Sequence, residues 1–345
     1  MTSPHPRVCA LIPAHNEEQR IEPALQSLFA QTRPPDRIVV IADNCTDATA
    51  TMVRARFGAS VEVRELFDNR ARKAGALNAA MKTVDDTEFV VTLDADTVLD
   101  RDFIAEALDE MRRDASIGGV GGRCMPQPMQ PGRKRLARLL WRAQCHEYAR
   151  EDSTRIERRG AVDVMPGAAM MIRCTALVDA GLWTVDSVVE DYHLSIQMRR
   201  RGWRTRVGFG CFCLTEVPDT PRALWRQRRR WYGGVINELR RFGAHDACRM
   251  ARNQYQLNNF GLLGSFVGLA LLFAWPLGLA PFPLGTTIVP VFTIATVDRI
   301  VRLRYLPHRT LRDVAWVLSP LADLFILFRQ AVWLTSIVAP PKSRW

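Results

Sequence analysis

The sequence predicts an α/β protein, with a doubly wound and mainly parallel sheet followed by C-terminal membrane helices. The first observation is that short apolar segments alternate with segments of helical spacing over residues 8–113, a rhythm typical of βαβ units. The second is that residues 1–250 hold 38 basic and 33 acidic side chains, whereas 251–345 hold only 9 and 3. We therefore expect a charged globular domain over 1–250 and a membrane-associated helical region over 251–345.

The alternation in the first hundred residues predicts four strands that are separated by three helices. Each strand is a short apolar run, and the segments between them place apolar side chains at helical spacing. Thr46 is a reasonable N-cap for the second helix. The strands are expected at 8–12, 38–42, 61–64 and 89–93, and the helices at 21–30, from Thr46 to about 57, and from about Lys73 onwards.

The remainder of the globular domain is less regular. It contains a long charged segment of helical pattern, and a Pro166-Gly167 turn between two short apolar runs. The expected elements are a helix at 102–113, a glycine-rich strand at 118–123, a helix at 133–157, two short strands between 162 and 173, and a loop at 188–198 that enters a helix closed by basic residues 199–201.

Two carboxylates, Asp94 and Asp96, directly follow the fourth predicted strand. In a parallel sheet, ligands bind outside the carboxyl ends of the strands. Acidic side chains at that edge suit a hard divalent cation, which prefers oxygen ligands and keeps positions open for substrate phosphates. The alternative is a strand that ends in a turn where Asp is common for backbone reasons.

Other polar side chains follow the neighbouring strands. Glu17 comes after the first strand and Asp43 after the second, so both are expected at the same sheet edge as Asp94. Lys73 lies at a helix start, where a cation is unfavourable for the helix dipole unless a phosphate binds there; a solvated surface lysine is the alternative. The chain has neither a Gly-x-Gly-x-x-Gly after its first strand nor a P-loop, which disfavours a dinucleotide dehydrogenase and a P-loop ATPase.

Glu190 and Asp191 stand where the 188–198 loop enters a helix. A carboxylate at this position could act as a general base that accepts a proton from a hydroxyl group, although acidic residues also suit the first turn of any helix. Gly167 permits close approach of a ligand to the backbone, or it simply forms a turn.

The basic and aromatic segment 225–231 is the last one whose side chains suit contact with a substrate. Its tryptophans, Trp225 and Trp231, offer flat faces for stacking on a sugar, and its arginines can bind phosphate in a bidentate manner. The same composition also suits nucleic acid or a membrane surface.

Taken together, these segments resemble the family-2 glycosyltransferases with the GT-A fold. In particular they resemble the processive branch, which contains cellulose, chitin, hyaluronan and poly-N-acetylglucosamine synthases. The resemblance covers residues 8–231. The segments that carry it are Ile-Pro-Ala-His-Asn-Glu-Glu at 12–18, Asp43, Lys-Ala-Gly-Ala-Leu-Asn at 73–78, Asp-Ala-Asp at 94–96, Glu-Asp at 190–191 and Gln-x-x-Arg-Trp at 227–231.

The resemblance implies a role for each matching residue. Asp191 would be the catalytic base, with Glu190 beside it. Asp96 would be the metal ligand, with Asp94 close to both the metal and the nucleotide. The residues that would contact the donor are Pro13, His15, Glu17, Asp43, Lys73, Asp94, Gln227 and Arg230.

The reaction implied by the resemblance is inverting transfer of a sugar from a nucleotide-sugar donor, expected to be a UDP-hexose or UDP-N-acetylhexosamine, with Mg²⁺ or Mn²⁺ as cofactor. A growing polysaccharide would receive the β-linked sugar and would meet Trp231 and, more loosely, Gly167. Transfer of one sugar to a lipid-linked acceptor is the alternative within this enzyme class. An inactive, basic protein that binds a membrane surface or nucleic acid is the alternative of another class; for the enzyme, no nucleic acid is expected.

The C-terminal region predicts spans across a membrane. Residues 253–297 contain no Lys, Arg, Asp or Glu. Within and just beyond them, 257–275 and 284–301 each approach the ~20 residues that are needed to cross a bilayer, and a break rich in Pro and Gly separates the two. A buried hairpin in the protein core is the alternative.

The charges around the third apolar segment suggest a topology. Five arginines lie in the loop 299–312, which the positive-inside rule places in the cytosol with the globular domain. The segment 314–338 is interrupted by Asp323 and Arg329, so it spans if they are paired, or lies at the interface. We expect a multi-pass protein of the cell membrane. We expect no span before the globular domain, and we therefore expect a partner protein or self-association to take part in export of a product.

Overall fold

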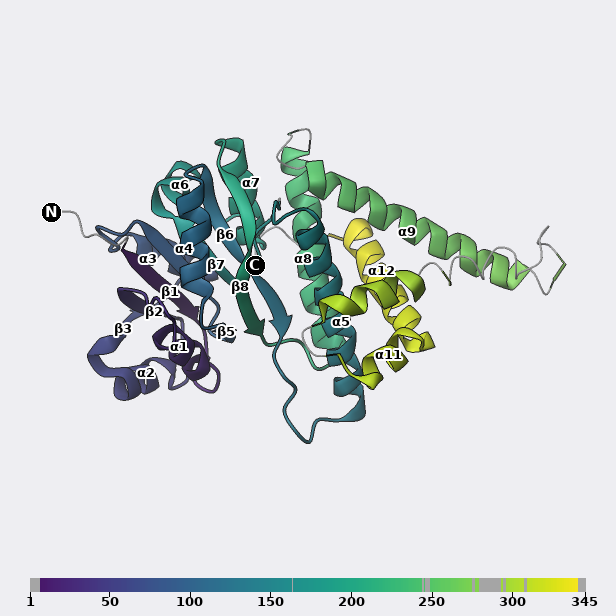
Figure 1. The fold of residues 1–345 in the computed structure, drawn as a ribbon, viewed down its shortest axis with the longest axis horizontal. Helices are drawn as coiled ribbons and strands as arrows, with labels where there is room; N and C mark the ends of the chain where they lie inside the picture. Colours follow the sequence, from purple (N-terminus) through teal and green to yellow (C-terminus); the bar gives the residue numbers. More distant parts are fainter. Residues whose placement is uncertain are drawn as a thin grey trace.

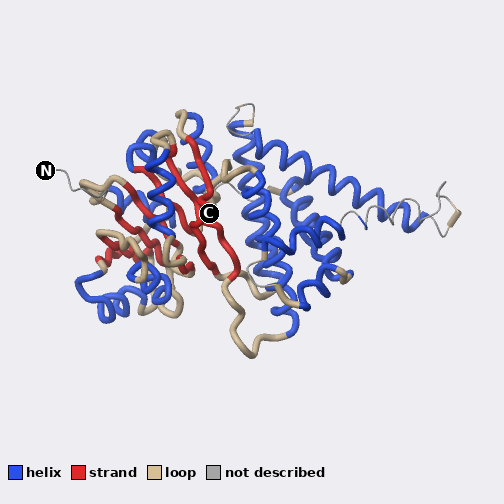
Figure 2. Tube along the Cα trace, viewed as in Figure 1, coloured by secondary structure: helices blue, strands red, loops and turns tan. Residues whose placement is uncertain are grey.

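The computed structural model describes residues 7–162, 164–243, 245, 249–274, 277–278, 293, 296–306 and 309–340. Within these residues, one eight-stranded sheet forms the centre of the globular domain. The sheet and its covering helices lie at one end of the molecule, and a group of long helices lies at the other (Figure 1). Strands and long helices are thus largely segregated along the molecule (Figure 2).

The first half of the sheet is parallel, as the sequence predicts. Its strands stand in the order β3-β2-β1-β4, and each neighbouring pair runs in the same direction. The helices between them cover both faces, so this half is doubly wound. The elements are β1 Val8–Ala14, α1 Ile21–Phe29, β2 Arg37–Asp43, α2 Thr49–Phe57, β3 Glu62–Leu66, α3 Arg72–Met81 and β4 Phe89–Leu93.

Alternating side chains of β1 build two separate cores. Ala10 and Ile12 pack on the face that α1 covers, whereas Cys9 and Leu11 pack on the face that α3 covers. A strand that is buried on both faces reads as a continuous apolar run rather than an alternating one. The apolar run at 8–12 therefore predicts this strand correctly.

The second half of the sheet is mixed, so the prediction of a mainly parallel sheet holds only for the first half. β7 runs antiparallel to both β4 and β6, and β5 runs antiparallel to β8, whereas β6 and β8 are parallel. A strand followed by a helix gives the same sequence pattern whether or not the chain crosses over the sheet. The strands are β5 Thr97–Leu99, β6 Ile117–Pro126, β7 Ala169–Arg173 and β8 Arg204–Thr215.

Three of the helices in this half are confirmed within a few residues, and two were not predicted. The confirmed helices follow the predicted segments at 102–113, 133–157 and 188–201. The short helix after β7 and the helix that contains the 225–231 segment are additional. The helices are α4 Phe103–Arg113, α5 Arg135–Glu157, α6 Cys174–Asp179, α7 Glu190–Arg200 and α8 Pro221–Phe242.

Two local predictions are wrong. Thr46 does not cap α2: the helix begins at Thr49, and the backbone N–H of Thr46 donates to Asn16 Oδ1 at 2.8 Å. The apolar run before Pro166 does not form a strand, because among the described residues only Ala161 makes an isolated bridge there; Asp163 of that run lies outside the described residues. Both segments instead form hydrogen bonds with distant parts of the chain, Thr46 with Asn16 and Val162 with Thr205.

The helix α8 begins with a strong local signal that the sequence contains. Pro221 occupies the first turn, and Thr220 Oγ1 accepts a hydrogen bond from the N–H of Ala223 at 3.3 Å. Both features favour a helix start at this point. The helix buries Arg228 and Glu238 together with small and apolar side chains, so its inner face is unusually polar.

In its described residues, the C-terminal region contains α9 Arg249–Ala274, helical residues at 296–302, the short turn η3 Leu303–Tyr305, α11 Leu311–Val317 and α12 Pro320–Val338. α9 contains the predicted span 257–275 up to Ala274, and it extends away from the sheet (Figure 1). Most of the predicted span 284–301 lies outside the described residues. The predicted segment 314–338 is divided, because Ser319 caps α12 and accepts from the N–H of Leu321 at 3.1 Å.

One helix in the described part of the chain, α12, is long and apolar enough to cross a membrane. Its two interrupting charges are both paired. Asp323 contacts Arg299 at 2.7 Å, and Arg329 contacts Glu147 of α5 at 2.9 Å. Among the described residues there is thus one candidate span, which packs against the globular domain, and the multi-pass arrangement expected from the sequence stays a prediction.

Candidate active site

The loops after β1 and β2 are joined to each other at the carboxyl edge of the sheet. His15 Nδ1 lies 2.7 Å from the carbonyl oxygen of Asp43, and the N–H of Glu17 donates to Thr49 Oγ1 at 2.8 Å. Pro13 lies in β1 beside Ile41 of β2. The structure thus brings together, at the carboxyl edge of the sheet, four residues that are expected to contact the nucleotide-sugar donor. They are Pro13, His15, Glu17 and Asp43, and the strand pattern predicts this placement.

Asp43 is held by an asparagine that the sequence reasoning did not select. Asn69 Nδ2 donates to Asp43 Oδ1 at 2.9 Å, and burial raises the pKa of this carboxyl. A Cβ atom on Gly75 would lie 2.2 Å from Asn69 Oδ1. The glycine in the segment 73–78 is therefore required for the close approach of Asn69, and so for the position of Asp43.

Lys73 is the centre of the site. Its ammonium contacts Asp94 Oδ1 and also lies 3.0 Å from the carbonyl oxygen of Gly167 and 3.6 Å from Glu190 Oε1. Burial lowers the pKa of Lys73, but the charges of Asp94 and Glu190 outweigh it and hold the pKa above its usual value. One cation therefore connects the end of β4, the turn before β7 and the start of α7.

Asp191 lies next to this cation at the first turn of α7. Its Oδ1 accepts a hydrogen bond from the N–H of Tyr192 at 2.8 Å. Burial and the charge of Glu190 raise the pKa of Asp191 to about 6, against the opposing effect of Lys73. A Cβ atom on Gly167 would lie only 2.4 Å from Asp191 Oδ2, so the glycine leaves the space that this carboxylate occupies.

Asp96 lies in a strongly acidic environment. Burial, followed by the charges of Asp94, Glu17 and Glu216, raises the pKa of Asp96 to about 7. A carboxylate that neighbouring anions destabilise in this way is suited to a bound cation, which would relieve the repulsion. In the part of the chain that the structure describes, no group of three or more His, Cys, Asp or Glu side chains forms a metal cage. The residues fit a divalent ion that takes its remaining ligands from substrate phosphates and water.

The helix α8 brings Arg230 towards these carboxylates. Arg230 Nη1 donates to the carbonyl oxygen of Val188 at 3.4 Å, and its charge acts to lower the pKa of Asp191. A Cβ atom on Gly234 would lie 2.6 Å from Val189. The close packing of α8 on the segment before α7 therefore depends on a glycine one turn beyond Arg230.

Gln227 and Trp231 are held from within the same helix. Gln227 Oε1 accepts a hydrogen bond from Arg228. The guanidinium carbon of Arg228 also lies 4.3 Å from the ring centroid of Trp231, which is partly buried against the core. Of the predicted residues of this segment, Arg230 is thus near the acidic centre, whereas Gln227 and Trp231 both contact the intervening arginine.

Several residues that shape the site carried no clear signal in the sequence. Asn78 forms two hydrogen bonds with the backbone of Trp183, at 2.7 and 3.1 Å, and so connects α3 to the loop before α7. His193 Nδ1 lies 2.9 Å from Glu238 Oε2 and joins α7 to α8. Glu216 follows β8, a strand that was not predicted. Only the position of Asn78 in a recognisable segment could have drawn attention to it.

Comparisons with known proteins identify the class to which this chain belongs. The model of the family described as "Glycosyltransferase like family 2" matches residues 5–234, which is more than half of the chain. The chain therefore belongs to this family, and it is a glycosyltransferase. The resemblance inferred from its short segments is confirmed.

Two relatives with known names show which glycosyltransferases the chain resembles in sequence. The chain is 30% identical over 229 residues to a poly-beta-1,6-N-acetyl-D-glucosamine synthase of Staphylococcus aureus, covering 65% of this chain and 53% of the relative. A synthase of the same name from Staphylococcus epidermidis is 28% identical over 229 residues, with the same coverage of 65% and 53%. The chain thus spans about half the length of the curated relatives it matches.

A solved structure confirms the fold. The mannosyltransferase PcManGT from Pyrobaculum calidifontis, solved in complex with GDP-mannose and Mn²⁺, superposes with a TM-score of 0.61 at 20% identity. The match covers 97% of this chain and 87% of that one. The fold is GT-A-like, as expected, with a mixed sheet rather than a mainly parallel one.

Proposed function

We propose that this glycosyltransferase transfers a sugar from a nucleotide-sugar donor to a carbohydrate acceptor with inversion, and that Asp191 is the general base. The observation that supports the proposal most strongly is the arrangement around Lys73. Its ammonium contacts Asp94 and lies near Glu190 and the carbonyl oxygen of Gly167. Lys73 thereby connects Asp94, which is proposed to bind the sugar donor at the sheet edge, to the start of α7, where Asp191 lies.

The proposed reaction is a single displacement at the anomeric carbon. Asp191 accepts the proton of an acceptor hydroxyl as the hydroxyl oxygen forms a bond to that carbon. The bond between the anomeric carbon and the phosphate oxygen breaks, and the nucleoside diphosphate leaves with the electron pair. An α-linked donor then gives a β-linked product. The raised pKa of Asp191, about 6, suits a base that must be ionised near neutral pH and still accept a proton.

The leaving group carries negative charge that this site can offset. Lys73 and Arg230 supply two positive charges beside Asp94 and Asp191. A divalent cation such as Mg²⁺ or Mn²⁺ held by Asp96 and Asp94 would supply further stabilisation of the diphosphate as it leaves. The pKa of Asp96, which burial and nearby carboxylates raise to about 7, supports this assignment.

For the donor and the product we propose a UDP-linked N-acetylhexosamine and a growing β-linked polysaccharide. The support is the similarity to synthases of poly-beta-1,6-N-acetyl-D-glucosamine. Trp231 would support the terminal sugar of the acceptor, and Gly167 would act on the acceptor side by leaving room for Asp191. Pro13, His15, Glu17, Asp43 and Gln227 would line the donor side.

We further propose that the chain is attached to a membrane by its C-terminal helices, with the globular domain in the cytoplasm. The support is the apolar helix α12 together with exposed apolar side chains on α9, among them Leu257, Phe260 and Leu263. Extraction of the intact protein by carbonate, without detergent, would contradict an integral attachment. Reporter fusions within the segment 299–312 test its cytosolic location.

A panel of nucleotide sugars tests the enzymatic proposal. Purified membranes that contain the protein are incubated with each donor, with and without EDTA, and release of the nucleoside diphosphate is measured. We expect turnover of a UDP-linked sugar that EDTA abolishes and that Mg²⁺ or Mn²⁺ restores. A protein that only binds membranes or nucleic acid would show no turnover with any donor. Sizing of the product then separates polymerisation from transfer of one sugar to a lipid-linked acceptor.

A further inference from the structure

We propose that Glu147 is a positioning residue which, through Arg228, holds Trp231 in place, and that Arg329 makes the C-terminal helix α12 part of this support. The inference rests on the proposed function, because it assumes that Trp231 meets the acceptor. It adds two residues outside the segments that carry the family resemblance, and it gives α12 a role in the reaction besides attachment.

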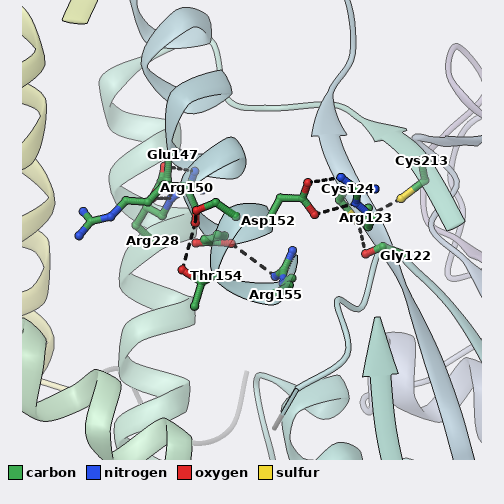
Figure 3. Close-up of polar contacts among 12 residues, drawn as sticks. Gly122, Arg123, Cys124, Glu147, Arg150, Asp152, Thr154, Arg155, Cys213 and Arg228 are labelled. Atoms are coloured by element: carbon green, nitrogen blue, oxygen red, sulfur yellow. Dashed lines mark hydrogen bonds and ion pairs between the residues drawn. The ribbon is translucent and has the colours of Figure 1, made fainter. Parts of the chain in front are cut away.

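The core of the arrangement is a buried ion pair between α5 and α8. Glu147 Oε2 lies 2.7 Å from Arg228 Nη2, and Glu147 Oε1 lies 3.2 Å from Arg228 Nε. The two side chains are only 2% and 1% exposed. Figure 3 shows Glu147 on α5 beside Arg228 on α8. Two hydrogen bonds to one carboxylate fix the plane of the guanidinium as well as its position.

A second arginine completes the arrangement from α12. Arg329 Nε lies 2.9 Å from Glu147 Oε1, and it also donates to Tyr232 Oη at 3.0 Å. The carboxylate of Glu147 is therefore shared by one arginine of α8 and one of α12. Because Tyr232 belongs to α8, Arg329 contacts one side chain of α5 and one of α8.

The fixed guanidinium of Arg228 acts on two side chains of the proposed substrate site. It lies over the ring of Trp231 at 4.3 Å from the ring centroid, a distance that is typical of a cation–π contact. It also donates to Gln227 Oε1. Residues three apart on a helix are neighbours on its surface, so Arg228 is well placed to set the orientation of Trp231.

Aromatic contacts extend the support along α8. The rings of Tyr232 and Trp333 are 5.3 Å apart, and those of Trp225 and Phe328 are 5.7 Å apart, both in edge-on geometry. Arg229 Nη2 donates to the carbonyl oxygen of Ala339 at 2.8 Å. α12 thus packs along the part of α8 that carries Gln227, Arg230 and Trp231.

Stability alone does not account for this cluster. One positive and one negative charge must be removed from water and a second positive charge partly removed, and apolar side chains of similar size often give equal or greater stability at such sites. What charged pairs supply, and apolar contacts do not, is a defined orientation. Arg228 contacts both Gln227 and Trp231, and Trp231 is the one of these two that is proposed to meet the acceptor.

The chain offers a matched control on the same helix. Asp152 of α5 forms a buried two-point pair with Arg123 of β6, at 2.9 and 2.6 Å, and Figure 3 shows it further along α5 from Glu147. Asp152→Asn removes from α5 a carboxylate of comparable burial, and the partner of this carboxylate is on β6 rather than on α8. Glu147→Gln keeps the shape of the side chain and removes the charge that both arginines share.

The experiment uses the full chain in detergent with the donor that the wild type turns over. For Glu147→Gln and Arg329→Met we expect shorter products and about tenfold slower transfer, whereas the donor KM stays within about twofold of the wild type. Asp152→Asn should leave product length unchanged. In a Trp231→Phe background, Glu147→Gln should have much less additional effect on product length, because the two changes act through one contact.

Other outcomes would overturn the inference. Losses that follow the folded fraction, or that Asp152→Asn reproduces, would show that Glu147 only stabilises the fold. Independent effects of Glu147→Gln and Trp231→Phe would show that Glu147 does not act through Trp231. If Glu147→Gln does not fold, Arg329→Met decides, since Arg329 lies at the edge of the cluster and is 24% exposed.

Failure of the proposed function can be recognised separately. If the wild type turns over no donor, the enzymatic proposal fails, and tryptophan fluorescence then decides the positioning claim. The contribution of Trp231 is the difference between spectra with and without Trp231→Phe. We expect Glu147→Gln to change this difference and Asp152→Asn to leave it unchanged; a difference in the Glu147→Gln background that equals the wild-type difference would overturn the inference.

Discussion

Different forces hold the two sides of the candidate site. The strands β1 to β4 and their helices are fixed by apolar side chains on two faces of a sheet, whereas α5, α8 and α12 are joined by buried charged pairs such as Glu147–Arg228 in addition to aromatic contacts. Apolar packing has no preferred direction, but paired charges fix orientation. We therefore expect changes at the sheet edge to abolish the chemistry, and changes among the helices to alter which product forms.

The largest effect is expected where the two sides meet, at Asp191. Asp191→Asn has nearly the same shape but cannot accept a proton, so turnover should fall about 10²–10⁴-fold. Donor binding should persist, because the donor side of the sheet is unchanged. Calorimetric titration with the nucleoside diphosphate, together with the turnover rate, checks both parts. Lost donor affinity with unchanged turnover of bound donor would make Asp191 a binding or capping residue.

A change at the sheet edge should remove dependence on the metal. Asp96→Asn is expected to lower divalent-dependent turnover by at least about two orders of magnitude. The fold should tolerate it, since the change relieves repulsion from Asp94, Glu17 and Glu216. Turnover across a Mn²⁺ titration, with a thermal unfolding curve as control, measures both. A mutant with wild-type turnover would exclude Asp96 from the mechanism.

Substitution of Gly167 tests whether the turn before β7 must leave space for the carboxylate of Asp191. In Gly167→Ala the new Cβ would lie 2.4 Å from Asp191 Oδ2, so the carboxylate must move. A displacement of this size is expected to cost about 10²-fold in turnover. Gly261→Ala is the control, because the nearest atom to its Cβ, Gln330 Nε2, would lie 3.7 Å away. Full activity of Gly167→Ala would argue against the proposed position of Asp191.

The smallest effect on chemistry is expected on the helical side. Trp231→Ala should shorten the product, and it should weaken acceptor binding by a factor that corresponds to about 1–3 kcal/mol, the value of stacking on an aromatic ring. Donor KM should change little. Electrophoresis or mass spectrometry of the products provides the readout. If the wild type itself adds only one sugar, the proposal of polymer synthesis is wrong and a lipid-linked acceptor is favoured.

The same contrast explains how much the sequence could predict. The strands β1, β2 and β4 appear as plain apolar runs because both of their faces are buried. β8 was missed because Phe209, Phe212 and Leu214 are exposed on it, so its apolar pattern does not alternate; Arg123 lies over the ring of Phe212 at 4.1 Å, a contact between distant segments.

The site shows the same division. The positions of Asp43, Asp94 and Lys73 follow from strand ends and helix starts, which local sequence reveals. The hydrogen-bond partners of Asn69 and Glu147 lie 26 and 81 residues away in the chain. No local pattern distinguishes these side chains from solvated surface residues, so their importance emerges only from the fold.

The most direct test of Asp191 as the general base is the pH dependence of single-turnover rates in the wild type and in Asp191→Asn. The base must be ionised to act, and its pKa is raised to about 6. With Mn²⁺ saturating at every pH, so that Asp96 stays ionised, the wild-type rate should therefore be constant above this pH and fall about tenfold per pH unit below it, while the slow rate of Asp191→Asn should not vary with pH over the same range. An equal decline in both proteins, or no decline in the wild type, would contradict the assignment of Asp191 as the base.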